Sequence, residues 1–79
     1  MRGFVSKWDP EEQTGLIRAC PQNQTYALLG KDNSGVANRL NSIYPKGFNT
    51  NASCPGRPDA VQVTFDPGPD ETAQNVVIV

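Results

Sequence analysis

The chain contains no histidine, and this absence removes the commonest general base and the imidazole ligand of zinc and iron. Without it, a serine or cysteine has no ordinary partner that would activate it as a nucleophile. The only two cysteines, Cys20 and Cys54, are too few and too far apart for a tetrahedral thiolate site. Asp66, Asp70 and Glu71 are alternative calcium ligands, but the proline and glycine between them favour a solvated turn. We therefore expect no enzyme activity, no metal and no cofactor.

Long apolar runs and an excess of one charge are also missing. The longest run, Val76–Val79, is far shorter than the roughly 20 residues that span a bilayer, so we expect no membrane segment. Seven basic and eight acidic residues give a net charge of −1, so no global field attracts nucleic acid or an anionic membrane. No basic or apolar leader is present, and cytosolic proteins rarely keep disulfides. These features predict a cytoplasmic protein with Cys20 and Cys54 as free thiols, a disulfide between them being the alternative.

What the chain does contain is turn residues. Its 79 residues include seven glycines and seven prolines, with 37% apolar residues, which predicts a single domain over residues 1–79 built of short strands. The clearest unit is a hairpin at the start, with strands Phe4–Trp8 and Gly15–Ala19 around a turn at Asp9–Gln13. The pattern does not decide which face of the first strand is buried, because Val5 and Lys7 share one face while Phe4, Ser6 and Trp8 share the other.

The remaining elements follow from propensity and alternation. A third strand is expected at Thr25–Leu29, a helix capped by Ser34 from Gly35 to about Tyr44, a loop at Phe48–Asp59, a strand at Ala60–Phe65, a turn at Asp66–Glu71 and a last strand at Thr72–Val79. The strand Ala60–Phe65 alternates most regularly, with Val61, Val63 and Phe65 expected to face the core.

This order of elements predicts a mainly β fold. Three strands, a short helix or long loop, and two more strands in so short a chain are typical of a five-stranded antiparallel Greek-key barrel of the OB type. Closure of the barrel removes the exposed edges that an open sheet of five strands would leave. An SH3-like barrel is the main alternative.

Short motifs then resemble the bacterial cold-shock domain family. Gly3-x-Val5, an aromatic at Trp8 and Gly15-x-Ile17 resemble that family's opening, Gly-x-Val-x-Trp-Phe-Asn followed by Lys-Gly-Phe-Gly-Phe-Ile. Further matches cover most of the chain: Tyr26, Gly47–Thr50, Ala60–Phe65 and Ala73–Val76. Extra residues lie between Gly30 and Lys46 and around Ser53. The resemblance implies an OB barrel that stacks the bases of single-stranded RNA or DNA on an aromatic sheet surface.

The implied binding surface is reduced here. The candidate nucleic-acid-binding residues are Arg2, Lys7, Trp8, Tyr26, Lys46 and Phe48. Leucine, lysine or threonine stands at several positions where the family has aromatic residues. Because each stacked base contributes about 1–3 kcal/mol, so few rings predict weak binding. Each ring also has a second interpretation, since a tryptophan or tyrosine in a small barrel equally fills the core.

The leucines support a competing hypothesis. If Leu16, Leu28 and Leu29 replace aromatics on an outward face, they form an aliphatic patch, and such patches mark protein interfaces. The partner would then be another protein or a second copy of this chain. The two hypotheses differ in what they predict for Trp8, Tyr26 and Phe48: nucleic-acid binding requires all three rings on one open face beside Lys7, whereas protein binding requires the leucines on that face and the rings inside.

Overall fold

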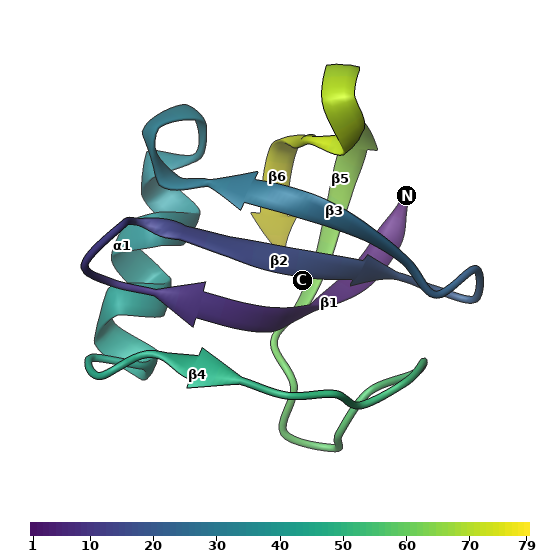
Figure 1. Ribbon diagram of the computed structural model, residues 1–79, viewed down its shortest axis with the longest axis horizontal. Coiled ribbons are helices and arrows are strands. Elements are labelled where there is room, and N and C mark those ends of the chain that lie inside the picture. Colours follow the sequence, from purple (N-terminus) through teal and green to yellow (C-terminus); the bar gives the residue numbers. More distant parts are fainter.

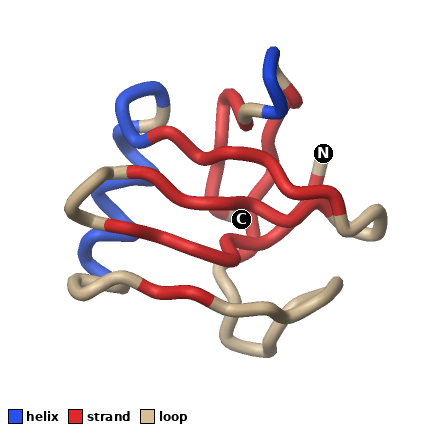
Figure 2. Tube along the Cα trace, viewed as in Figure 1, coloured by secondary structure: helices blue, strands red, loops and turns tan.

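The computed structural model describes all residues, 1–79. Its strands are β1 (Arg2–Asp9), β2 (Thr14–Ala19), β3 (Gln24–Leu29), β4 (Phe48–Asn49), β5 (Gln62–Pro67) and β6 (Ala73–Ile78). One α-helix, α1 (Ser34–Ile43), and two 3-10 turns, Gly30–Asp32 and Pro69–Glu71, complete the structure. Figure 2 shows how the helical segments gather at two ends of a mainly β body.

The strands form one strongly curled sheet in the order β3-β2-β1-β5-β6, with every pair of neighbours antiparallel. The short β4 pairs with the end of β1 that β5 leaves free. In Figure 1, β1, β2 and β3 lie in front, β5 and β6 cross behind them, and α1 covers one end. A parallel bridge between Ala27 and Thr72 brings the outermost strands, β3 and β6, together. The predicted class, a small OB-like β-barrel, is confirmed.

The predicted hairpin is present and its turn is built as the sequence indicates. The Asp9 carboxylate accepts hydrogen bonds from the backbone N–H groups of Glu11 and Glu12, at 3.0 and 3.4 Å. Such side-chain acceptors hold a tight turn in place of backbone groups. The structure has one strand more than the five predicted. The additional strand, β4, lies at the start of the segment that was predicted to be entirely loop.

The alternation predicted for the fifth strand is also confirmed. Val63 and Phe65 are buried, whereas Gln62 and Thr64 are exposed. The strand begins at Gln62, two residues later than predicted, but Val61 still packs against the core. Val61 lies close to β1, because its carbonyl accepts the N–H of Val5 at 3.0 Å.

Helix α1 forms where predicted and buries Val36, Ala37 and Leu40 against the barrel. The prediction of Ser34 as its cap is wrong, because Ser34 is the first helical residue and Asn33 occupies the capping position. Asn33 makes no side-chain capping bond either. Its side chain instead donates to the carbonyls of Leu29 (3.1 Å) and Ala73 (3.4 Å) and accepts the N–H of Val76 (3.1 Å). This buried amide therefore ties the start of the helix to β3 and β6.

We expect Asn33→Ala to lower the free energy of unfolding by about 1–3 kcal/mol, because it leaves the buried N–H of Val76 without a partner. Urea denaturation followed by tryptophan fluorescence measures this loss. Asn38→Ala, the same change at an exposed position of α1, is the matched control and should leave stability unchanged or slightly higher. Equal losses in the two variants would contradict the role assigned to Asn33.

Candidate binding surface

An irregularity in β1 decides which candidate side chains reach the surface. The pairing of β1 with β2 shifts between Val5 and Lys7, leaving Ser6 as an extra residue. Such a bulge breaks the simple alternation of side chains along a strand. Val5 and Trp8 consequently both belong to the core, while Phe4 and Lys7 point to the outer face of the sheet.

Trp8 lies inside the barrel, with only 1% of its surface exposed. It pairs with Gly15, where a Cβ would lie 2.2 Å from the Lys7 carbonyl oxygen, so only glycine permits this close approach. The indole Nε1 donates to the Asn41 side-chain oxygen of α1 at 3.0 Å. The prediction that Trp8 is a stacking surface is therefore wrong for this structure, because its ring closes the core against the helix.

Tyr26 is also internal, at 6% exposed. Its register partner is Ile17, which faces the core, so Tyr26 faces the core as well. Its ring lies 5.0 Å from that of Phe65, at an angle of 60°. This tilted packing is typical of aromatic pairs in a core. The expectation that Tyr26 presents a ring to a nucleic-acid base is also wrong.

The outer face of β2 and β3 is aliphatic. Leu16 and Ala27 are register partners on this face, and Leu29 lies two pairs further along, opposite Thr14. All three are half-buried. We call Leu16, Ala27 and Leu29 the outer strip. The hypothesis of an aliphatic patch also placed Leu28 on this face. That placement is wrong, because Leu28 points inward and is 1% exposed.

Four of the six sequence-predicted residues gather around an open depression of about 440 Å³ between β1 and β4, because Trp8 pairs with Phe48. Lys7, Lys46 and Phe48 line it together with Trp8. The half-buried ring of Phe48 stacks on Tyr44, with centroids 4.5 Å apart and planes at 12°. Lys7 and Lys46 are exposed, but the pairing of Phe48 with Trp8 places the Phe48 ring on the Trp8 side of the strands, opposite to the side chain of Lys7.

Arg2 lies apart from this group. It is five residues from Lys7 along β1, a separation of about 16 Å in an extended strand, and its register partner is Thr64 of β5. The structure therefore does not unite all six candidates in one site.

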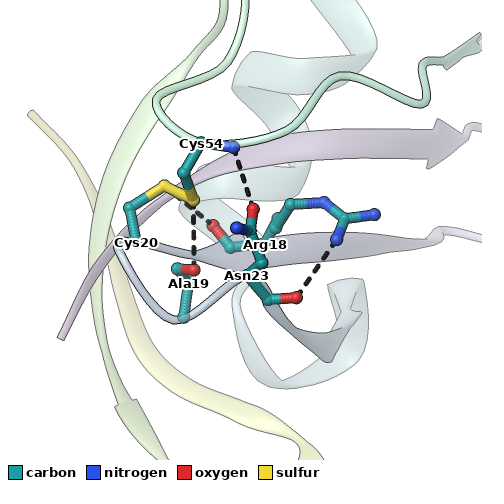
Figure 3. Close-up of a disulfide and its surroundings, with 5 residues drawn as sticks. All are labelled: Arg18, Ala19, Cys20, Asn23 and Cys54. Carbon is teal, nitrogen blue, oxygen red and sulfur yellow. Dashed lines mark hydrogen bonds between the residues drawn. A yellow bond between two sulfur atoms is a disulfide. The ribbon is translucent and has the colours of Figure 1, made fainter.

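A disulfide joins Cys20 to Cys54, which corrects the prediction of two free thiols. Cys20 follows β2, whereas Cys54 lies in the irregular segment 50–61, which we call the strap. Figure 3 shows the bond beside the β2–β3 turn, where the Asn23 side chain accepts the N–H of Cys54 at 2.9 Å. The sequence supplied the two thiols but no sign that the fold brings them together.

The largest depression, about 780 Å³, lies elsewhere, between α1 and β6. Its apolar members are Val36, Val76, Val77 and Ile78, and polar side chains such as Asn38 and Arg39 form the rest of its lining. It contains none of the candidate residues. No group of three or more histidine, cysteine, aspartate or glutamate residues is placed to hold a metal ion.

Comparisons with models of protein families, with curated proteins and with solved structures found no match for this chain. None of the helices has the length and apolar character needed to cross a membrane. The assignment of a binding surface therefore rests on the geometry described above.

The Tyr44 hydroxyl offers a measurable probe of this region, because burial and, to a lesser extent, the charge of Asp59 raise its pKa. A raised pKa means that the folded state keeps the proton which the unfolded chain releases near pH 10. Stability should therefore fall as the pH rises from that value through the pKa of the folded protein. Phenolate absorbance is titrated against pH in the wild type and in a Tyr44→Phe variant, and the ionisation missing from the variant is that of Tyr44.

Asp59→Asn should lower the Tyr44 pKa toward its ordinary value without removing the whole shift, because burial remains. Glu71→Gln, which removes one negative charge elsewhere on the surface, should leave the Tyr44 pKa unchanged. If the Tyr44 pKa of the Asp59→Asn variant equals that of the wild type, the strap does not hold Asp59 near this ring.

Proposed function

We propose that this protein is a non-catalytic binding module that uses the outer face of β2 and β3 to bind a protein partner. The observation that carries the proposal is which side chains are buried and which lie on the outer face. Trp8 and Tyr26 fill the core, while Leu16, Ala27 and Leu29 remain on the outer face. A surface that lacks stacking rings but keeps adjacent aliphatic groups favours another protein over bases.

The charges around the outer strip indicate the chemistry of the partner. Lys7 pairs with Leu16 across β1 and β2, and Arg18 lies next to Leu16 on the same face. Asp9, at the end of this face, uses its carboxylate to hold the hairpin turn. A peptide segment in which apolar side chains alternate with carboxylates would satisfy both the leucines and the cations.

Single-stranded nucleic acid is the second candidate. It is supported by the depression whose lining includes Lys7, Lys46 and Phe48. One stacked base contributes about 1–3 kcal/mol, so binding through this ring would be weak and would depend largely on phosphate contacts. It would also occupy a different place from the outer strip, which makes the two candidates separable.

The disulfide bears on the compartment. Disulfides persist in oxidising compartments and are usually transient in the cytosol. The cytoplasmic location expected from the sequence is therefore compatible with the Cys20–Cys54 bond only if that bond is made and broken there.

To test the protein-binding proposal, a displayed library of random peptides is selected on the immobilised protein. We expect enrichment of sequences that mix apolar and acidic residues, with amide shifts centred on Leu16, Ala27 and Leu29. Leu16→Thr should weaken their binding on the order of tenfold, because it removes most of a leucine's apolar contact from the interface.

Val77→Thr is the matched control for this test, since Val77 is 58% exposed on β6 and is not part of the outer strip. It should bind the selected peptides as well as the wild type. Sedimentation velocity shows whether the partner is a second copy: association that grows with concentration and is lost in Leu16→Thr would identify it. Peptides that bind wild type and Leu16→Thr equally would refute the proposal.

The nucleic-acid candidate is tested with single-stranded oligodeoxythymidine at low salt. If it is right, amide shifts appear at Lys7, Lys46 and Phe48, weaken as salt is added, and weaken further in Lys46→Glu. Arg39→Glu changes the net charge equally but lies on α1, so it serves as control. Absence of shifts, or equal effects of the two charge reversals, would exclude a specific site in the depression.

A further inference from the structure

The strap, residues 50–61, is attached to the barrel at both ends and near its middle. At one end the Thr50 N–H donates to the Ser6 carbonyl at 2.8 Å, and at the other the Val61 carbonyl accepts the N–H of Val5 at 3.0 Å. Near the middle, Cys54 is held by its bond to Cys20 and by the hydrogen bond from its N–H to Asn23. Figure 1 shows this segment leaving β4, swinging away from the sheet and returning below it to β5.

The strap covers an aromatic ring. Phe4 points to the outer face of β1, opposite Arg18 of β2, yet it is completely buried. Gly56 lies directly over the ring, because a Cβ built on it would be 2.9 Å from two ring carbons. Its φ of +89° is a backbone conformation that favours glycine. Phe4 is therefore buried by the strap and is not a member of the core cluster.

Arg18, the neighbour of Phe4 on this face, has one buried N–H group without a hydrogen-bond partner. Its Nη1 donates to the Asn23 carbonyl at 3.1 Å, as Figure 3 shows, but its Nε is buried without any hydrogen-bond partner. An unpaired N–H of a charged group disfavours the closed arrangement. The apolar contact of Phe4 with the strap is thus opposed by an unsatisfied guanidinium beside it.

The disulfide is the strongest attachment of the strap to the sheet. Besides it, the strap carries few backbone bonds to the sheet, and most of its side chains between Asn51 and Asp59 are polar or small. A segment with so few buried contacts opens locally at low cost once a covalent attachment is removed.

We propose that the Cys20–Cys54 disulfide is a redox-controlled latch, and that its reduction releases the strap and uncovers Phe4 and the buried Nε of Arg18. A dithiol reductant supplies two electrons and two protons: the S–S bond breaks, each cysteine becomes a thiol, and the reductant leaves as its own disulfide. The uncovered pair adjoins Lys7 and Leu16 on the same face. The opening would add one aromatic ring to the outer strip and free the Nε of Arg18, which is buried and unpaired in the closed form. The result would be a site for an apolar or aromatic side chain next to a carboxylate.

The latch does not rest on the proposed function, although the ligand of the uncovered site does. The first experiment therefore measures the latch alone, by amide hydrogen exchange of the wild type with the disulfide intact and after reduction. We expect the strap amides of Cys54 and Gly56 to exchange on the order of tenfold faster after reduction. The core amides of Ile17 and Tyr26, which are register partners in β2 and β3, should keep their protection, and binding of the apolar dye ANS should increase.

A second variant opens the strap without reduction. Gly56→Ala places a methyl group against the Phe4 ring and should raise strap exchange and ANS binding while the disulfide stays intact. Gly35→Ala is its control, because a Cβ there meets nothing within 4 Å. Unchanged strap protection after reduction would overturn the latch, and so would an equal loss of protection in strap and core, which would make the disulfide a general stabiliser.

The selected peptides then test the ligand separately. If the latch and the proposed function are both right, reduction strengthens peptide binding, and Phe4→Ala removes this gain without abolishing binding to the oxidised protein. If exchange shows opening but peptide affinity does not change, the latch stands and the extension of the outer strip fails.

Discussion

The register of β1 against β2 determines on which face Lys7 and Trp8, the two central candidates, lie. Because side chains alternate along a strand, a shift of one residue moves them to the opposite face. The irregularity between Val5 and Lys7 makes one such shift within β1, so that Val5 and Trp8, three residues apart, both enter the core. Gly15 makes the shift possible, since it alone lets Trp8 lie against the backbone of the neighbouring strand.

The consequence is a competition between core and surface for the few large side chains of a short chain. A small barrel buries a smaller fraction of its surface than a large one, so each aromatic ring in its core matters more. Trp8, Tyr26 and Phe65 are all used internally, with Trp8 held by the helix and Tyr26 packed on Phe65. The outer face is left with Leu16, Ala27 and Leu29, and its capacity for stacking bases is correspondingly reduced.

The parts of this structure that sequence predicted are those fixed by neighbouring residues. Alternation at Val61–Phe65 and the Asp9 turn are local patterns, and both hold in the structure. The failures depend on residues far apart in the chain. The disulfide partners are 34 positions apart, and Asn33 reaches an N–H 43 positions away, so neither contact leaves a local signature. The burial of Trp8 belongs to the same class, because a bulge in β1 is visible only once its partner strand is known.

The strap and the core are energetically separable, and this separation allows the outer face to change without loss of the fold. Phe4 is fully buried, but its cover is the strap, and the core cluster is complete without it. Opening the strap would therefore expose one ring and satisfy one guanidinium, while the contacts of Trp8 and Tyr26 with the interior stay in place. In a domain this small, a disulfide would ordinarily be interpreted as compensation for a limited core. Its position here argues for a second role, because it ties down a cover over the outer face and joins no two strands of the barrel.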